Sequence, residues 1–357
     1  MSDMEVGKHT ILILAALLGG CVLEAPPIRA RSGHAPESPP REERPQTGPD
    51  LHYSPNAVQH TFYEVGQTVD PALSWDGKTL YYASSQDGAT FDIYCKQVGE
   101  IPAVKKTFHA ADDMQPSVSP DGRLLAFVSN RNGNWDIFLK SLAPGAEEVR
   151  LTGGETDDIS PSWSPDGRRI VYSSYNARAE RWELMMITLS KEGWETASLN
   201  TEGLFPAWRP VKGSETIVFQ KPRGRAPQLY GLWTVSSDGR NLVEIVGSTA
   251  FGAVTPAWTR DGRWIVFSSV PAERADEGRA GNLWMVGMDG KGLAKISEGS
   301  APEYAPVCAP DGTVYFTTRR SGIKNIWSLT PDFGNNDEGI DERKGIPVRR
   351  SDDVKQA

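Results

Sequence analysis

Short apolar segments alternate with turn sequences along most of this chain. Segments rich in valine, isoleucine, phenylalanine and tyrosine, such as LYYAS, LAFVS and IVFSS, are bounded by glycine and aspartate. Enrichment in β-branched and aromatic residues between such turns is typical of β-strands. Apolar residues do not recur at helical spacing over any long stretch, so the pattern predicts an all-β protein.

The same strand pattern recurs in six copies. Each copy begins at a proline and continues with a turn, an apolar second strand, a third strand of the DIYCK type and a fourth segment that is weakest in copy three. The prolines lie 45, 45, 45, 50 and 50 residues apart: Pro71, Pro116, Pro161, Pro206, Pro256 and Pro306. Four strands repeated at this period predict a six-bladed β-propeller of four-stranded antiparallel blades.

Two recurrent features have structural explanations. An Asp-Gly pair marks the turn after the first strand in five copies, whereas copy four has RPVKGSET instead. We interpret these pairs as turn formers rather than metal ligands. Trp163, Trp208 and Trp258 occupy one position of their copies. We expect them to pack between blades rather than to form a ligand cage.

A closed ring requires a fourth strand for the last copy. The segment HTFYEVGQTVDP, which ends at Pro71, aligns with KKTFHAADDMQP, which ends at Pro116. We therefore expect residues 60–64 to complete blade six and so to join the two ends of the propeller. Residues 345–351, GIPVRRS, are a rival for the same position. Otherwise residues 332–357 are predicted to form a charged tail.

The first residues resemble the signal of a bacterial lipoprotein. The apolar stretch ILILAALL leads into LLGGC, which resembles a lipobox and implies cleavage after residue 20 and lipidation of Cys21. The lipid would anchor the protein to a membrane. Residues 21–56 contain eight prolines among charged residues, so we expect a disordered tether. The propeller is then predicted to span residues 57–331.

The repeats carry a family resemblance. The form Pro-x-Trp-Ser-Pro-Asp-Gly-Arg, followed by Asp-Ile-Tyr, resembles the propeller repeats of the TolB family over about Thr61 to Leu329. This resemblance implies a six-bladed propeller in the bacterial cell envelope. The folded domain that precedes the propeller in that family has no counterpart here. Similar repeats form half of the prolyl oligopeptidase-like peptidases, but we identify no hydrolase domain after the last copy.

The residue inventory argues against catalysis. The chain has five histidines, and none follows His109, so neither a Ser-His-Asp triad nor a histidine-bound metal is expected within the ring. The net charge of -8 argues against a nucleic-acid partner. Cys95 and Cys308 are expected to be small buried residues, with a disulfide as the alternative. We therefore predict no enzyme, no cofactor and no bound metal.

Carboxylates recur just ahead of the repeat prolines, in loops that lead into the innermost strands. We expect these residues to surround one mouth of a central tunnel, where they contact a partner: Asp70, Asp113, Asp157, Asp158, Glu202 and Glu303. The alternative is that they accept hydrogen bonds from backbone N–H groups between blades.

Arginines gather in the loops between second and third strands, which open on the same face. These residues predict a basic rim around the acidic mouth: Arg178, Arg181, Arg223, Arg225, Arg274, Arg279, Arg319 and Arg320. Variable loops on a rigid scaffold are common sites of recognition, and arginine is enriched at protein interfaces.

Together these features predict a monomeric, non-catalytic outer-membrane lipoprotein that faces the periplasm. It would bind an envelope protein through its loop-rich face. The alternative is a carbohydrate- or peptidoglycan-binding module that uses an aromatic residue near the mouth, such as Tyr175 or Tyr304. A hydrolase or a lyase is the least favoured function.

Overall fold

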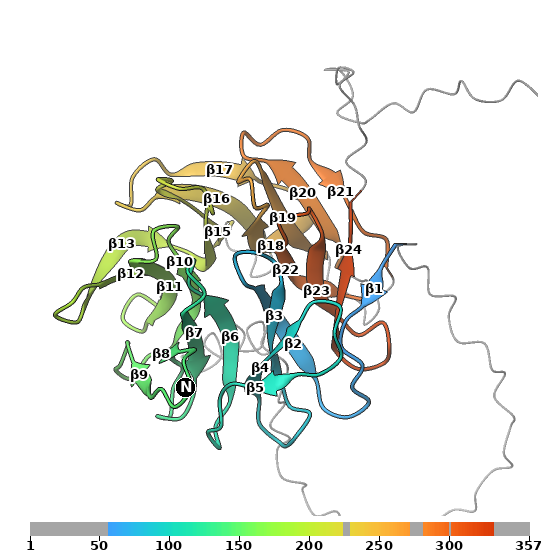
Figure 1. Ribbon diagram of the computed structural model, residues 1–357. Helices are drawn as coiled ribbons and strands as arrows, with labels where there is room; N and C mark the ends of the chain where they lie inside the picture. The colour runs from blue at the N-terminus through green and yellow to red at the C-terminus, as the bar shows by residue number, and fades with distance from the viewer. Residues whose placement is uncertain (1–55, 224–228, 272–280, 300, 332–357) are drawn as a thin grey trace, which may run out of the picture. The chain divides into compact units, whose positions relative to one another are not determined.

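Six four-stranded sheets follow one another around a ring (Figure 1). The structure is a computed structural model that describes residues 56–223, 229–271, 281–299 and 301–331. Within these ranges every sheet is antiparallel and no helix occurs, so none is present that could cross a bilayer. The innermost strands contact one another in the order β2, β6, β10, β14, β18, β22 and again β2. The predicted six-bladed propeller is therefore confirmed.

Each blade is numbered by its order in the chain. Blades one to three contain β2 (Thr68–Leu73), β3 (Thr79–Ser84), β4 (Asp92–Gln97), β5 (Val104–Lys105); β6 (Asp113–Val118), β7 (Leu124–Ser129), β8 (Asp136–Ser141), β9 (Glu148–Arg150); β10 (Asp158–Trp163), β11 (Arg169–Asn176), β12 (Arg181–Leu189) and β13 (Trp194–Glu202). Blades four to six contain β14 (Leu204–Trp208), β15 (Thr216–Pro222), β16 (Tyr230–Ser236), β17 (Val243–Val246); β18 (Phe251–Trp258), β19 (Trp264–Pro271), β20 (Leu283–Gly287), β21 (Ala294–Lys295); β22 (Glu303–Cys308), β23 (Val314–Thr318), β24 (Asn325–Leu329) and β1 (Val58–Gln59).

The Asp-Gly pairs form the turns that the sequence predicts. In blade two the Ser119 hydroxyl donates to Asp121 Oδ1 at 2.6 Å, and the same oxygen accepts the backbone N–H of Arg123 at 3.1 Å. Gly122 has a φ of 70°, a left-handed conformation in which glycine carries no steric cost. Copy four makes the corresponding turn with Gly213, whose φ is 78°. We call the end of the ring that carries these turns the turn face.

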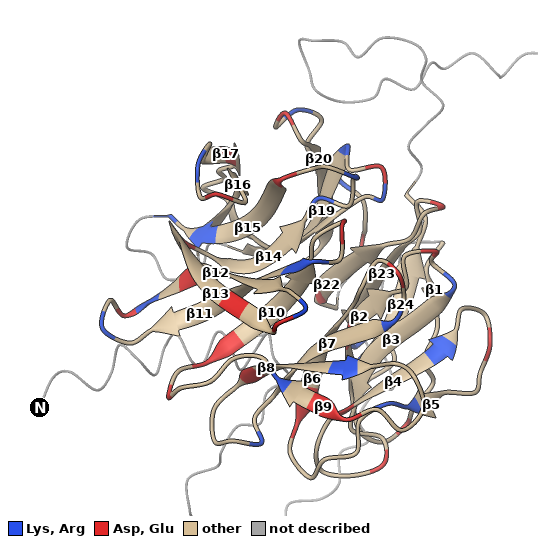
Figure 2. Ribbon diagram, turned by 60° about the vertical axis from the view of Figure 1, so that its left-hand side comes forward, with Lys and Arg blue, Asp and Glu red and all other residues tan. Residues whose placement is uncertain are grey.

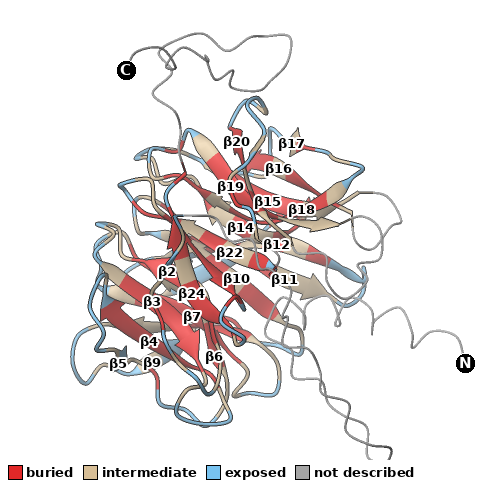
Figure 3. Cartoon of the chain, turned by 90° about the vertical axis from the view of Figure 1, so that its right-hand side faces the viewer, coloured by how far each residue is buried: buried red, intermediate tan, exposed pale blue. Residues whose placement is uncertain are grey.

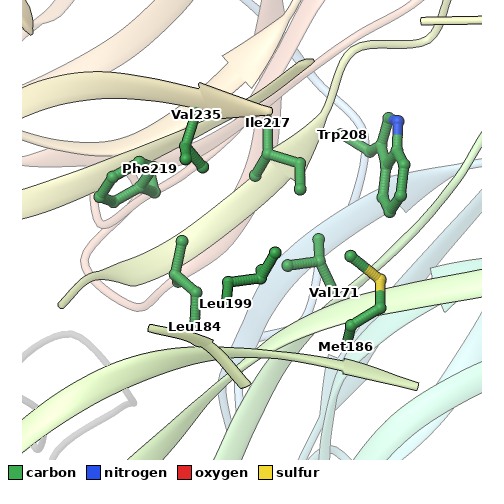
Figure 4. Close-up of a cluster of buried hydrophobic side chains, with 8 residues drawn as sticks. All are labelled: Val171, Leu184, Met186, Leu199, Trp208, Ile217, Phe219 and Val235. Carbon is green, nitrogen blue, oxygen red and sulfur yellow. The ribbon is translucent and has the colours of Figure 1, made fainter. Parts of the chain in front are cut away.

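Apolar side chains fill the spaces between neighbouring blades. Figure 4 shows Val171, Leu184, Met186 and Leu199 of blade three facing Trp208, Ile217, Phe219 and Val235 of blade four. Buried positions concentrate in the strands and exposed positions in the loops (Figure 3). Trp163 Nε1 donates to the carbonyl of Ser117 in blade two, and Trp258 Nε1 donates to Ala207 in blade four, both at 3.0 Å. These contacts confirm that the repeated tryptophans pack between blades.

The N-terminal segment closes the ring. Val58 and Gln59 pair with Ser328 and Trp327 of β24, slightly ahead of the predicted residues 60–64. The Thr61 hydroxyl accepts the N–H of Ile326 at 2.9 Å, as the Thr107 hydroxyl accepts that of Ile93 in blade one. The alignment of the two segments was therefore right, and the strand precedes the threonine in both blades. The rival residues 345–351 lie outside the described part of the chain.

Blade three differs from its prediction. Its fourth segment looked weakest in sequence, yet β13 spans Trp194–Glu202 and is nine residues long, whereas β9 in blade two has three residues. Most side chains of β13 are exposed. An exposed edge strand needs few apolar residues, and for this reason the hydrophobic pattern missed it.

Candidate functional site

Every innermost strand carries a β-bulge directly at its repeat proline. The pairing register shifts at this point in all six blades, and the residue before each proline has a positive φ: Asp70, Gln115, Ser160, Phe205, Thr255 and Ala305. These residues lie on the strands nearest the ring axis. Asp70 is the one charged residue of the six, so the ring of bulges has a distinct chemistry at blade one.

Side chains at these bulges tie neighbouring blades together. The Asp70 carboxylate accepts the backbone N–H of Gln115, and Gln115 Oε1 accepts the N–H of Ser160 at 2.8 Å. On the other side of the ring Gln220 Oε1 accepts the N–H of Thr255 at 2.8 Å. Hydrogen bonds of this kind satisfy backbone groups that the bulges remove from strand pairing.

Asp70 lies near Lys324 and Tyr304 of blade six, at the junction where the ring closes. The Lys324 ammonium lies 5.6 Å from the centre of the Tyr304 ring, and the backbone N–H of Thr68 in β2 donates to the Lys324 carbonyl at 2.9 Å. Arg319 stands in the same loop as Lys324, between β23 and β24. We call Asp70, Tyr304, Arg319 and Lys324 the junction cluster.

The charges in the junction cluster act on one another. Burial raises the pKa of Asp70 to about 6, although the nearby Lys324 opposes this change. Burial lowers the pKa of Lys324, and Asp70 partly offsets that effect. Burial also raises the pKa of the Tyr304 hydroxyl. The cluster therefore holds a carboxylate, a phenol and the Lys324 ammonium where charge is weakly solvated, with the exposed Arg319 at its edge.

The other predicted acidic residues already have partners. Asp113 forms an ion pair with Arg131, with 3.0 Å between Oδ1 and Nη2, and Asp157 Oδ1 accepts the N–H of Trp135 at 2.9 Å. Glu202 lies 3.5 Å from the Lys221 ammonium. Glu303 forms a fully buried ion pair with Arg320. In the structure these carboxylates join strands and blades, and their contact with a partner stays a prediction.

Asp158 is buried, and no basic side chain among the described residues forms an ion pair with it. Burial raises its pKa from 3.8 to about 6, the hydroxyls of Ser174 and Thr152 oppose the change, and the negative charges of Asp136 and Asp157 add to it. The folded protein therefore binds this proton more tightly than the unfolded chain does. It follows that the charge destabilises the fold above about pH 6 and that this cost disappears as the pH falls towards 4.

Asp158→Asn changes the free energy of unfolding, and we expect this change to be more stabilising at pH 7.5 than at pH 4. The difference should be about 3 kcal/mol, which corresponds to a pKa difference of this size. Urea unfolding of both proteins between pH 4 and 7.5 measures the difference. Asp121→Asn is the matched control with the opposite sign, because the Ser119 hydrogen bond lowers the pKa of Asp121. A pH-independent difference for Asp158→Asn would contradict the account of this group.

The predicted arginine rim is only partly exposed. Arg178, Arg181 and Arg319 are exposed, and Arg181 also pairs with Glu183 at 2.7 Å. Arg223 is partly exposed and pairs with Glu244 at 2.7 Å. Arg320 does not belong to the rim, because its side chain is fully buried beside Glu303. Basic and acidic residues are interspersed around the ring (Figure 2). The remaining predicted residues and segments lie outside the described part of the chain: Arg225, Arg274, Arg279, Cys21 with its signal and tether, and the tail.

The loops that carry these arginines and the start of each innermost strand share one end of the ring, which we call the loop face. On the turn face Arg260 of blade five lies 4.1 Å from the centre of the Trp75 ring in blade one, and its Nε donates to the Trp75 carbonyl at 3.3 Å. Blades five and one are not neighbours. This contact therefore joins two blades across the turn face.

Lys324 was not predicted as a site residue, although the sequence held a signal for it. The residue two positions before the central apolar residue of the third strand is aromatic in blades one to four: Phe91, Trp135, Trp182 and Tyr230. Copy six has Lys324 there. A lysine at a position that is otherwise aromatic is not explained by the packing that the other copies share.

The His60–Ser328 pair and the two buried cysteines are reactive residue types that have structural roles here. His60 Nε2 lies 2.8 Å from Ser328 Oγ, and burial together with Lys96 lowers the pKa of His60 to about 4. Ser328 is only 4% exposed, so this pair is not accessible to a substrate. Cys95 and Cys308 are buried and not bonded to each other. In the described ranges no three His, Cys, Asp or Glu side chains are placed to hold a metal ion.

Comparison with known proteins agrees with the architecture. A family model described as TolB beta propeller domain matches residues 56–260. A TolB protein of Agrobacterium tumefaciens superimposes with a TM-score of 0.56 at 20% identity, over 74% of this chain and 90% of that one. TolB of Acinetobacter baumannii gives a TM-score of 0.55 at 19% identity, over 68% and 57%. Oligogalacturonate lyase of Vibrio parahaemolyticus gives 0.54 at 14% identity, over 79% and 96%. No relative was found among curated proteins.

Proposed function

The chain belongs to the TolB beta propeller domain family, and on this basis we propose that it is a non-catalytic cell-envelope protein that binds another protein through its loop face. The observation that carries the proposal is the difference between the two ends of the ring. Short turns of nearly uniform sequence form the turn face, whereas the loop face combines exposed arginines with the junction cluster. Recognition commonly resides in such variable loops on a rigid scaffold.

The location follows from the family and from the predicted lipid anchor. The likeness to TolB proteins supports a place in the bacterial envelope, and lipidation at Cys21 would hold this chain at the outer membrane on the periplasmic side. The proline-rich residues 21–56 would let the propeller reach a partner at some distance from the membrane. Mass spectrometry of the mature N-terminus tests the anchor.

The alternative functions have less support. Oligogalacturonate lyase shares the fold at 14% identity, and identity at that level supports the architecture alone. A carbohydrate-binding platform needs an accessible aromatic face, but Tyr175 packs on Trp182 with 5.4 Å between ring centres. The Tyr304 hydroxyl is likewise buried. Protein binding therefore remains the function that the geometry supports best.

Charge reversal on the two faces tests the proposal. We expect Arg178→Glu, Arg181→Glu and Arg319→Glu together to weaken the capture of one specific envelope protein by the full chain at least about tenfold. Arginines at protein interfaces often contribute a large share of the binding free energy. The matched variant carries Arg123→Glu, Arg168→Glu and Arg263→Glu, all exposed on the turn face, and should bind normally. Quantitative mass spectrometry of the captured proteins measures both. Equal loss in the two variants, or capture of peptidoglycan alone, would contradict protein binding by the loop face.

A further inference from the structure

Three polar groups in the junction cluster lack hydrogen-bond partners. Lys324 is only 7% exposed, and its ammonium group forms no hydrogen bond or ion pair with the described residues. The Tyr304 hydroxyl and Asp70 Oδ2 are also buried without a hydrogen-bond partner among those residues. Buried polar atoms are nearly always satisfied, and an unsatisfied one costs about 1–3 kcal/mol. Two such atoms, from β2 and β22, beside the largely buried Lys324 side chain are a sign of a binding site.

The backbone fixes these groups in place. The Lys324 carbonyl accepts the N–H of Thr68, so the lysine stands on a loop that is tied to blade one. The Asp70 carboxylate is held by the Gln115 N–H. Tyr304 lies in β22, at the position paired with Thr317 of β23. Because strands rather than long loops carry Asp70 and Tyr304, the site is formed before any ligand arrives.

The charge of the cluster selects the ligand. Lys324 and Arg319 contribute two positive charges and Asp70 contributes one negative charge, so a single negative charge balances the site. Lys324 supplies three N–H donors and Tyr304 one O–H donor. A carboxylate offers two acceptor oxygens and one charge, which matches this set. A phosphate group carries more charge and would face stronger repulsion from Asp70.

We infer that the junction cluster binds a carboxylate of the partner polypeptide, with Lys324 and Tyr304 as donors and Arg319 at the entrance. This inference rests on the proposed function for the source of the ligand, because the partner is taken to be a protein. Asp70 and Tyr304 are each partly exposed as residues, whereas the Tyr304 hydroxyl and Asp70 Oδ2 are covered, so the carboxylate would enter from the loop face past the exposed Arg319. The carboxylate is either the C-terminus of the partner or an acidic side chain.

The test uses the full chain and three short peptides. The probes are N-acetyl-trialanine, the same peptide as its C-terminal amide, and N-acetyl-Ala-Asp-Ala-amide. Backbone amides of Thr68 and Gln115, which adjoin the cluster, report binding by NMR. We expect one or both of the carboxylate peptides to shift these resonances while the neutral amide does not. The peptide that binds identifies a terminal or a side-chain carboxylate as the source.

Substitutions assign the binding to the cluster. Lys324→Met keeps the length of the side chain and should weaken carboxylate binding at least tenfold, and Arg319→Met should weaken it severalfold. Lys78→Met, an exposed lysine on the turn face, is the matched control and should change nothing. Arg319 is exposed, so its variant keeps the test valid if Lys324→Met fails to fold. Equal shifts with the neutral peptide, or no shift at 20 mM peptide, would overturn the inference.

The partner-capture assay separates this inference from the proposed function. If the arginine-reversal variant loses the partner while Lys324→Met retains it fully, the loop face binds a protein but the cluster does not hold its carboxylate. If the arginine-reversal variant retains the partner, the proposed function itself fails. Loss of the partner in both variants, together with loss of peptide binding in Lys324→Met, supports both.

Discussion

Deletion of residues 57–61 is expected to lower the free energy of unfolding by about 5 kcal/mol or more. The deletion removes β1, which pairs with β24, the hydrogen bond from the His60 N–H to the Ile326 carbonyl at 2.8 Å, and the Thr61 hydroxyl. Each lost hydrogen bond costs about 0.5–1.5 kcal/mol, and a buried donor without a partner costs about 1–3 kcal/mol. Blade six would also present an open edge.

Urea unfolding followed by tryptophan fluorescence measures this effect. The control combines Phe62→Ala with Val65→Ala, because these neighbouring side chains are 62% and 76% exposed and should matter little. An unchanged midpoint in the deletion variant would show that another segment, such as residues 345–351, closes blade six instead. The first three strands of that blade follow β21 in the chain, so closure by residues 57–61 joins distant parts of the sequence.

Glu303→Gln is expected to destabilise the fold by about 3–5 kcal/mol, because it removes the buried carboxylate that pairs with the Arg320 guanidinium. Both side chains of this pair are fully buried, and Glu303 also accepts a hydrogen bond from the Ser297 hydroxyl. The substitution preserves size and shape, so packing is not disturbed. Denaturant unfolding at pH 7 gives the change in free energy.

A double substitution distinguishes charge from packing at this site. Glu303→Leu with Arg320→Met removes both charges and should recover most of the loss, since apolar residues often replace a buried ion pair at little cost. The exposed pair of Arg240 and Asp238, 3.8 Å apart, is the control, and Asp238→Asn should change stability by less than about 1 kcal/mol. Equal losses from Glu303→Gln and the double variant would contradict the view that the loss in Glu303→Gln comes from the uncompensated charge.

The sequence predicted the ring because its turns and packing residues repeat. Asp121 and Gly122 specify a turn by local hydrogen bonds, and the likeness of the segments that end at Pro71 and Pro116 identified the closing segment. The length of β13 could not be predicted from hydrophobicity, because exposed polar residues such as Thr196 and Ser198 form most of that strand. Local chemistry was thus sufficient for the architecture but not for every strand boundary.

The site was harder to predict because its chemistry depends on strand register. Asp113 pairs with Ser129 in the sheet, and its ionic partner Arg131 lies two residues beyond that position. Glu303 and Arg320 have the same relation to Thr318. A list of carboxylates near prolines cannot show which are neutralised in this way, so Asp70 and Asp113 looked equivalent. The register separates them and leaves Asp70 beside Lys324.

In-cell photo-crosslinking tests most directly whether the loop face binds a protein. A photoreactive amino acid would replace Arg178 or Arg319, both exposed on the loop face, with Arg168 on the turn face as the control. Mass spectrometry would identify the adducts. The account predicts one dominant protein adduct from both loop-face positions and none from the control. The absence of any protein adduct at Arg178 and Arg319, or the same adducts at Arg168, would contradict it.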